Sequence, residues 1–554
     1  MADTVIKGGT IVDGTGMPAF VGDVAITDGT IEQVGGVLSG DKVIDATGLH
    51  VVPGFVDVHT HYDAQLHFDP SASPSSWHGV TTVLTGNCGF ALAPSKPADV
   101  DWLVQMLAKV EGMSPDALAA GVPWSGGSLG DFFDGLDGRI GVNMACYAGH
   151  AAIRRWVMGA AASERAATAA EIRAMQAVMD QAMRDGAIGL STSQLDVHAD
   201  HEGKPVPPNL ATPEEIIALT SVMADYKLGA SMNLCRTFGN GYDESDRKLL
   251  AEMCRSSGGK PVHVNILLRF TNDPEIWKTC LGVLEGYASQ GLRIYPMASA
   301  NPKGLYVSLA DTILLSEMPT FRESLALPID ERIKALGDPG VRHRLKREFG
   351  EPRQLAFGWD NLRIVDSPSR PELNNRTVAA AAGGADGMDT FLDLAIADRL
   401  DTLFLIDRPV EQEDRDVIAF LLRHPLTMPG SSDGGAHLNT FCGADYTTRV
   451  LTEYVSDEFT FEHAVRRLAA MPAQTVGMWD RGELRPGNAA DIVLIDRSTL
   501  GVGEAKMVND FPTGAMRVIW EQTGYVSTIV NGQTLIDNGS YTGALPGSVI
   551  RYNR

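Results

Sequence analysis

Two histidines separated by one residue, His59 and His61, come directly after an apolar run at residues 51–58. The β-branched residues of that run predict a buried parallel strand. Residues two apart in a strand point to the same side, so both imidazoles would leave the strand end side by side. Because neutral imidazoles are common zinc ligands, the pair predicts half of a metal site. The alternative is two structural histidines beside a turn.

Two more segments carry groups that could complete such a site. Cys88 lies in a glycine-flanked segment at residues 86–89, after a β-branched run at residues 79–84. Asp433 lies in a Gly- and Ser-rich segment at residues 430–437. A thiolate is stabilised beside zinc, and a carboxylate at a strand end can bind a metal and accept a proton from water. The alternatives are a small core cysteine and an aspartate in an ordinary glycine-rich turn.

Strands and helices that alternate along the middle of the chain must position these groups. The expected elements, in chain order, are helix 161–184 with strand 187–191, helix 213–227 with strand 230–234, helix 244–256 with strand 262–267, and strand 402–405 with helix 415–423 and strand 427–430. Gly186 is expected to cap the first of these helices in the left-handed conformation. Repeated βα units imply a parallel sheet. An α/β fold of the (β/α)8 barrel type fits the length, and it places its chemistry at strand carboxyl ends.

The two ends of the chain have a different pattern. Residues 1–53 and 481–554 contain short strands separated by Gly-, Asn- and Asp-rich turns. We expect them to form one small β-sandwich domain around a barrel domain at residues 54–480. Residues from about 300 to 375 are rich in Pro, Arg and Glu and show few strands, which indicates an insertion over the barrel mouth that serves as a lid.

The composition limits the possible partners. The chain has 554 residues and a formal net charge of −23, which argues against nucleic acid and anionic membranes because both need a basic surface. Six scattered cysteines without a CxxC spacing do not indicate a disulfide framework. No signal-peptide pattern and no apolar run of about 18 residues is present. We therefore expect a cytoplasmic protein that acts on a small molecule and could form a homo-oligomer.

The ordered set of motifs resembles the amidohydrolase superfamily and, within it, the N-acyl-D-amino-acid deacylase (D-aminoacylase) group. In that group the cysteine of Gly86-Asn87-Cys88-Gly89 replaces a carboxylated lysine as bridging ligand. The resemblance implies a (β/α)8 barrel with a β-sandwich made from both termini. The motifs that carry it are at residues 54–63, 79–83, 86–89, 148–150, 186–193, 432–437 and 487–493.

The chain departs from the group at two positions. The fifth and sixth barrel strands usually supply two further histidines. At the first position this chain has Leu234, or Asn233 if the register differs by one, and at the second it has Ile266. His263 comes three residues earlier, and strand alternation turns it to the other face unless a bulge shifts the register. The polar residues nearest these positions are Asn233, Cys235 and Asn265.

We therefore expect one Zn²⁺ ion per chain, with two as the alternative. Its ligands would be His59, His61, Cys88 and Asp433. The ion would activate water for attack on an amide carbonyl, with Asp433 as general base and then as acid for the leaving amine. The expected activity is hydrolysis of a non-peptide amide C–N bond, most like that of the N-acyl-D-amino-acid deacylases.

Other functions stay open. A single-metal enzyme of the same fold could act on a cyclic amide, a carbamate or an ester, or cleave a C–C bond. A metal-free binding or scaffold protein is a second alternative, against which the four intact donors argue. A hydrolase that uses Cys88 or Ser191 as nucleophile is disfavoured, because no G-x-S-x-G elbow and no base paired with Cys88 is evident.

Some further residues are expected to bind the substrate. His150, near a strand end, could orient the substrate carbonyl, and Tyr295 occupies a position where the resemblance implies a substrate-facing tyrosine. A substrate carboxylate would need an arginine fork. Arg376 is one candidate, and the others are Arg236, Arg269 and Arg363.

The remaining polar residues are expected to support the ligands. Asp63 could pair with a ligand histidine and fix its tautomer. His263 and His437 are expected in supporting or structural positions. The histidines in predicted loops, for which solvated or structural positions are expected, are His67, His78, His198 and His201.

Overall fold

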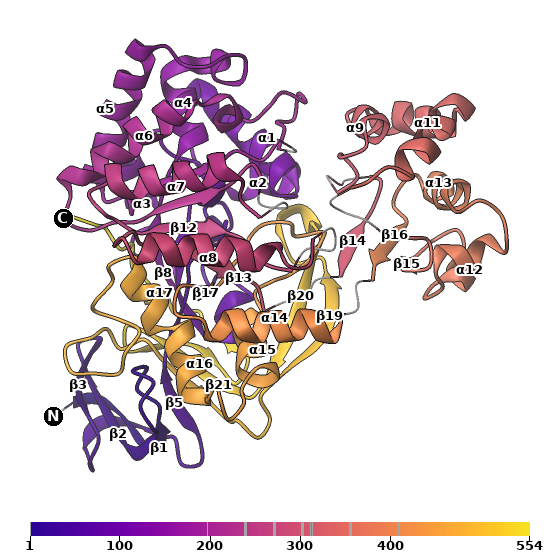
Figure 1. Ribbon diagram of the computed structural model, residues 1–554. Helices are drawn as coiled ribbons and strands as arrows, with labels where there is room; N and C mark the ends of the chain where they lie inside the picture. Colours follow the sequence, from indigo (N-terminus) through magenta and orange to yellow (C-terminus); the bar gives the residue numbers. More distant parts are fainter. Residues whose placement is uncertain are drawn as a thin grey trace.

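The computed structural model describes residues 2–196, 198–237, 241–269, 273–300, 304–310, 312, 314–353, 357–407 and 410–553. This part of the chain forms a barrel, a sheet built from both chain ends, and an inserted unit beside the barrel (Figure 1). Among these residues no helix is both long enough and apolar enough to cross a membrane.

Parallel strands form the barrel. In chain order they are β6 (Phe55–Asp57), β7 (Val80–Thr85), β8 (Asn143–Cys146), β9 (Ala148–Gly149), β10 (Leu190–Ser193), β11 (Ser231–Leu234), β12 (Val262–Asn265), β13 (Ile294–Ala298) and β17 (Met428–Pro429). Strands β6, β7 and β8 pair in this order, and so do β9, β10, β11, β12, β13 and β17. The consecutive strands β8 and β9 are two pieces of the third barrel strand. The His61 N–H donates to the Gly434 carbonyl at 2.6 Å and so closes the last strand onto the first.

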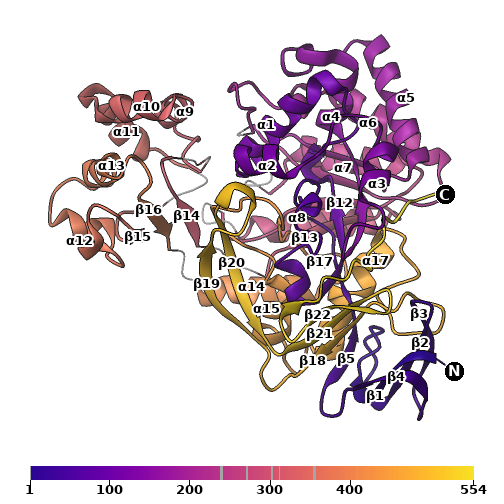
Figure 2. The same cartoon turned by 180° about the vertical axis from the view of Figure 1, so that it is seen from behind.

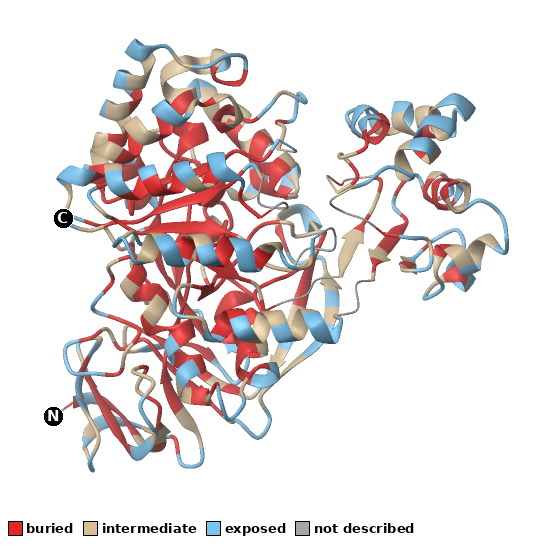
Figure 3. Cartoon of the chain, in the orientation of Figure 1, coloured by how far each residue is buried: buried red, intermediate tan, exposed pale blue. Residues whose placement is uncertain are grey.

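Helices cover the outside of the barrel. Every residue of β7 is buried, as expected for a parallel strand with a packed face on each side. Figure 3 shows buried strands inside and helices whose outer faces are exposed. The covering helices are α3 (Leu129–Leu136), α4 (His150–Met158), α5 (Ala169–Asp185), α6 (Pro213–Ser221), α7 (Glu244–Ser256), α8 (Ile276–Ala288), α14 (Gln412–Arg423), α15 (Tyr446–Glu453), α16 (Phe461–Leu468) and α17 (Ala470–Thr475). Two further helices, α1 (Val100–Val110) and α2 (Pro115–Gly121), lie in the segment between β7 and β8.

Helix α5 begins later than expected. The sequence predicted a helix from residue 161, but Thr168 is the N-cap, and its hydroxyl and the Glu171 carboxylate form a capping box. These reciprocal bonds satisfy two amides that the helix itself cannot bond, which fixes the start of the helix. Gly186 ends it with φ of 115°, as predicted.

Strands from both chain ends share one sheet. They are β1 (Ala2–Ile11), β2 (Phe20–Thr27), β3 (Thr30–Val34), β4 (Gly40–Asp45), β5 (His50–Pro53), β18 (Ile492–Ile495), β21 (Tyr525–Val530), β22 (Gln533–Asp537) and β23 (Ser540–Tyr541). The two halves meet where β5 pairs with β18, with Val52 opposite Val493. Buried aliphatic side chains from both halves, including Ile6 and Ile529, form their shared core.

A hairpin near the C-terminus packs against the barrel mouth. It consists of β19 (Gly501–Val508) and β20 (Arg517–Thr523), which pair with each other. The Val518 N–H donates to the Leu438 carbonyl at 2.7 Å. The hairpin therefore supports the segment that follows β17, where Asp433 lies.

The inserted unit extends beyond the predicted limit near residue 375. Its sheet has the order β14 (Leu305–Val307), β16 (Leu403–Ile406), β15 (Leu362–Asp366). The prediction of a barrel strand at residues 402–405 was wrong, because β16 runs antiparallel between β14 and β15. Figures 1 and 2 show the unit to one side of the barrel. Its helices are α9 (Pro319–Leu325), α10 (Ile329–Gly337), α11 (Pro339–Phe349), α12 (Val378–Ala382) and α13 (Gly387–Ala397).

Candidate metal centre

Adjacent barrel strands bring the three metal-binding candidates together. His59 and His61 follow β6, and Cys88 lies in the short 3-10 turn Asn87–Gly89 after β7. All three side chains are buried, with exposures of 0%, 2% and 5%. In the part of the chain that the structure describes, their ligand atoms form a group that lies within 4.8 Å of one another.

The turn that carries Cys88 depends on a glycine. Gly86 has φ of 71°, and a Cβ on it would come within 2.6 Å of the Tyr147 carbonyl oxygen. The hydroxyl of Ser191 on β10 donates to the Gly86 carbonyl and accepts from the Gly89 N–H at 3.1 Å. Close approach to β8 and β10 thus fixes the turn and aims Cys88 at the histidines.

Asp433 reaches the same point from the last strand. Its Oδ1 lies 3.1 Å from His59 Nε2, and Cys88 Sγ lies 3.4 Å from the same nitrogen. The Ser432 hydroxyl donates to the His59 carbonyl at 3.1 Å. Gly435, with φ of 87°, lets this segment pass the His61 backbone, since a Cβ there would lie 2.7 Å from the His61 carbonyl oxygen. His59 Nε2 is therefore shared by a thiol and a carboxylate.

The donor set fits zinc. Burial lowers the pKa of His61 well below its ordinary value, so its ring is neutral and offers a lone pair. Burial raises the pKa of the Cys88 thiol, and the nearby Glu111 and Asp433 carboxyls raise it further. A cation at this point would act in the opposite direction and favour the thiolate. Two imidazoles, a sulfur and a carboxylate are the ligand types that zinc uses in proteins.

Glu111 is a site residue that the sequence did not reveal. It follows α1 and is 2% exposed, and its Oε1 lies 3.4 Å from His61 Nδ1. Burial raises the pKa of Glu111 well above its ordinary value, as do the charges of Asp433 and Asp63. A single glutamate at a helix end has no spacing that marks it, so only the folded chain identifies it.

Two loop histidines lie at the edge of the cluster. His437 Nε2 lies 3.8 Å from Glu111 Oε2, in agreement with a supporting position. His198, for which a solvated or structural position was expected, accepts or donates a hydrogen bond at Nδ1 with Ser193 Oγ at 3.2 Å. Burial lowers the pKa of His198 to about 3, and the nearby His437 lowers it further while Asp433 raises it. His198 is thus close enough to the cluster to sense its charges.

Asp63 has a different role from the one predicted. Its Oδ2 accepts from the Gly86 N–H at 3.0 Å, and its Oδ1 lies 3.8 Å from Cys146 Sγ. Burial raises the pKa of Asp63 to about 6. Through these contacts Asp63 supports the Cys88 turn and not a ligand histidine.

At the mouth, the ends of the fifth and sixth barrel strands, β11 and β12, do not carry the histidines that the resemblance implies. Leu234 is level with Ser193 on β10 and with Asn265 on β12. Residues in register on parallel strands face the same side, and Ser193 contacts the site residue His198. The interior position beside Leu234 is therefore Asn265, and not Ile266 as the sequence indicated.

His263 faces the barrel interior. The sequence predicted an outward position, because His263 is three residues before Ile266 and strand residues alternate between faces. His263 is instead two residues before Asn265 and shares its interior face. Its Nδ1 lies 3.4 Å from the Tyr147 hydroxyl. Burial lowers its pKa to about 3, and the charge of His59 contributes. His263 thus lies below the cluster, within electrostatic reach of one ligand.

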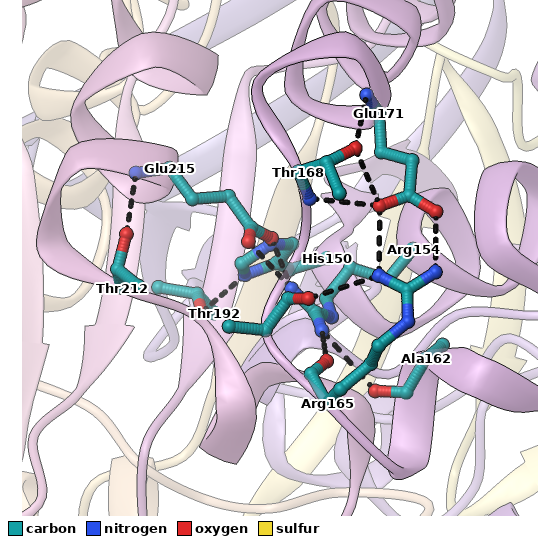
Figure 4. A network of polar contacts seen from close by, with 10 residues as sticks. His150, Arg154, Ala162, Arg165, Thr168, Glu171, Thr192, Thr212 and Glu215 are labelled. Carbon is teal, nitrogen blue, oxygen red and sulfur yellow. Dashed lines mark hydrogen bonds and ion pairs between the residues drawn. The ribbon is translucent and has the colours of Figure 1, made fainter.

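His150 is committed to a buried network instead of the substrate. Its Nδ1 lies 2.9 Å from Thr192 Oγ1, and its Nε2 lies 2.8 Å from Glu215 Oε1 (Figure 4). Arg154 forms an ion pair with Glu215 at 2.5 Å, and the exposures of all these side chains are 0%. Since both ring nitrogens are occupied, the prediction that His150 orients a substrate carbonyl was wrong.

The other substrate candidates lie away from the donors. Tyr295 is level with His263 and half-buried, so it is below the strand end. Arg376 is exposed on the inserted unit, just before α12. Each of the alternative arginines is paired with an aspartate, namely Arg236 with Asp196, Arg269 with Asp414 and Arg363 with Asp407.

Comparisons with known proteins agree with the site. The Amidohydrolase family model matches residues 42–536. D-aminoacylase from Alcaligenes xylosoxydans xylosoxydans is 28% identical over 561 residues, which cover 99% of this chain and 97% of that protein. A solved D-aminoacylase with a binuclear metal center has a TM-score of 0.67 at 26% identity over 100% of both chains. N-acyl-D-glutamate deacylase from Bordetella bronchiseptica, solved with zinc and a phosphonate inhibitor, has a TM-score of 0.68 at 25% identity over 99% of both chains. The family match spans most of the sequence, and the chain belongs to the amidohydrolase family.

Proposed function

We propose that this protein is a zinc-dependent hydrolase that removes the acyl group from an N-acyl-D-amino acid. The buried group of His59, His61 and Cys88, with Asp433 beside it, is the observation that carries the proposal. The relatives with this architecture include a D-aminoacylase and a zinc-containing N-acyl-D-glutamate deacylase. Both split an amide C–N bond, and the donors of this chain suit the same chemistry.

In the proposed reaction, water adds to the amide carbonyl carbon and the C–N bond then breaks. Zinc held by these donors would polarise the carbonyl and lower the pKa of water. Asp433 takes the proton from the attacking water and then gives it to the leaving nitrogen, which releases a free amine and a carboxylate. Asp433 Oδ1 lies 3.1 Å from His59 Nε2, which places the carboxylate beside the nitrogen that would bind the zinc.

We propose one zinc ion per chain. Leu234 and Asn265 at the ends of β11 and β12 support this count, because an aliphatic side chain binds no metal and an amide binds zinc poorly. The solved D-aminoacylase is described as activated by one metal and attenuated by a second. A one-metal site is therefore compatible with amide hydrolysis in a relative.

The same two residues favour a second candidate function. A mouth with donors on one side only could accept another carbonyl compound, namely a cyclic amide, a carbamate or an ester, or support C–C cleavage.

We also propose that the shared sheet of the two termini is part of a small β-sandwich, and that the inserted unit is a lid.

Product release from a substrate panel tests the proposal, with free amine measured for the N-acyl-amino acids and the carbamate, and free acid for the cyclic amide and the ester. The panel pairs N-acetyl-D-amino acids of acidic and apolar type with their L enantiomers, and adds a cyclic amide, a carbamate and an ester. We expect zinc-dependent amine release from D substrates and none from a His59→Ala/His61→Ala variant. Turnover confined to the cyclic amide, carbamate or ester would favour the second candidate. Equal turnover by the variant would contradict both.

A further inference from the structure

Glu111 places a carboxyl group inside the site that the proposed reaction does not use. It is 2% exposed, and it is the residue directly after α1 (Val100–Val110). An isolated carboxylate is costly to bury unless it is paired and hydrogen-bonded. The ion-pair partners that the structure shows for its two oxygens are both histidines, His61 and His437.

The geometry links Glu111 to one ligand and to one neighbouring loop. Its Oε1 lies 3.4 Å from His61 Nδ1, and its Oε2 lies 3.8 Å from His437 Nε2. Its main-chain carbonyl also accepts from the His437 N–H. The side chain therefore bridges the first barrel strand and the segment that carries Asp433.

A ligand histidine needs a partner for its second nitrogen. If His61 gives its Nε2 lone pair to a metal, Nδ1 must carry the proton, and an acceptor fixes the tautomer and the ring orientation. His61 Nδ1 is buried and has no hydrogen bond of good geometry among the described residues. Glu111 Oε1, 3.4 Å away, is an acceptor within reach, and such contacts often tighten only in the loaded site.

We propose that Glu111 is a positioning residue for the metal centre, whose Oε1 accepts from His61 Nδ1–H and so directs His61 Nε2 toward His59 and Cys88. The inference rests on the proposed function, because it assumes that His61 binds the metal. It deepens that function by adding a residue outside the ligand set. It also explains why a carboxyl group is retained at a buried helix end beside two histidines.

Three substitutions at Glu111 separate the effect of side-chain length from the effect of charge. Glu111→Gln keeps the length and an acceptor oxygen, Glu111→Asp keeps the charge but is one carbon shorter, and Glu111→Ala removes both. The exposed Asp116→Asn change on α2 (Pro115–Gly121) is the matched control. Zinc affinity is measured on each purified full-length protein by competition with a chelator, and thermal unfolding checks that each variant folds.

We expect Glu111→Ala and Glu111→Asp to bind zinc about 10–100-fold more weakly than the wild type, as for other supporting partners of ligand histidines. Glu111→Gln should retain most of the affinity, and Asp116→Asn all of it. Wild-type affinity in Glu111→Ala would overturn the inference. So would a reversed order, with Glu111→Asp near wild type and Glu111→Gln weak, because that order would identify charge as the cause.

A metal-independent measurement separates this inference from the proposed function. If the wild type takes up no zinc, the proposed function fails, and crystal structures of the metal-free wild type and Glu111→Ala then decide the inference. We expect the His61 ring to rotate or to occupy more than one orientation in the variant. An unchanged ring would overturn the role of Glu111 whatever the metal content.

Discussion

The two sides of the barrel mouth differ in what they offer a ligand. After β6 and β7 the chain presents two imidazoles and a thiol whose ligand atoms lie within 4.8 Å of one another. After β17 it presents the Asp433 carboxylate, whose Oδ1 lies 3.1 Å from His59 Nε2. At the ends of β11 and β12 it presents Leu234 and Asn265, on the same interior face. Strand ends of the same barrel thus offer metal ligands on one side of the mouth and poor or no ligands on the other.

The difference has an electrostatic meaning. A second cation near the first would need donors on the side of Leu234, and an aliphatic side chain cannot replace the water that a cation loses there. On the donor side, the anionic groups of Asp433 and Cys88 can neutralise one divalent ion. In the proposed site, the residues at two strand ends, and not the barrel alone, would therefore set the metal count.

Removal of the proposed proton carrier should have the largest effect. Asp433→Asn keeps the shape of the side chain but cannot take a proton from water, so we expect kcat to fall about 10²–10⁴-fold. Assays at saturating zinc separate this loss from weaker metal binding. The exposed Asp457→Asn is the control and should behave as wild type. A loss below about tenfold would remove Asp433 from the proton transfers.

Adding donors to the other side should change the metal count. Leu234→His with Asn265→His places two imidazoles on the interior face, and we expect zinc per chain to rise from about one to about two. Asn233→His is the matched control, because Asn233 Nδ2 contacts Met253 Sδ on α7, outside the barrel. An unchanged count in the double variant would show that its two positions do not reach the site.

The fold is also expected to lose stability in acid, because of a buried histidine at the amino end of β7. His78, just before β7, is bound at Nδ1 by Thr448 Oγ1 (2.7 Å) and at Nε2 by the Trp520 carbonyl (3.1 Å). Burial lowers its pKa from 6.5 to about 4. Between these values the unfolded chain binds the proton more readily, so stability should fall by about 3 kcal/mol as the pH drops from 7 to 4.

Denaturant unfolding at several pH values measures this effect. His78→Gln should flatten the slope between pH 4 and 6.5, while the exposed His201→Gln should not. An unaltered slope in His78→Gln would assign the acid sensitivity to other groups.

The smallest effect is expected at Arg376. The side chain is exposed on the inserted unit, so we expect Arg376→Ala to change KM less than about twofold and stability by less than about 0.5 kcal/mol. Measured KM for the preferred substrate checks this. A KM increase of tenfold or more would instead show that the inserted unit delivers Arg376 to the substrate when it closes.

Local pattern predicted the donor side well. His59 and His61 lie two residues apart at a strand end, and a short glycine-flanked turn carries Cys88, so neighbouring residues alone indicate their chemistry. The barrel followed from repeated strand–helix pairs. The residues that were missed or misplaced depend on contacts between distant segments. Glu111 meets His61 across 50 positions, Asn265 is identified by its register with Leu234, and β16 pairs inside the inserted unit.

His150 is a residue that local sequence wrongly assigned to the substrate, again because of a contact between distant segments. Its position near a strand end favoured a substrate contact, but Glu215, from α6, occupies its Nε2. No feature near His150 in the sequence reveals a partner 65 positions away. Tertiary contacts therefore decide whether a polar residue at the mouth serves the substrate or the scaffold.

The zinc content of the wild-type protein decides whether the barrel mouth holds a single metal ion. Elemental analysis of protein purified without added metal, and again after zinc loading and removal of free zinc, counts the ions per chain. We expect about one zinc per chain in both samples and none in His59→Ala/His61→Ala. About two per chain would contradict the claim that Leu234 and Asn265 limit the site to one ion, and none after loading would contradict a metal centre at His59, His61 and Cys88.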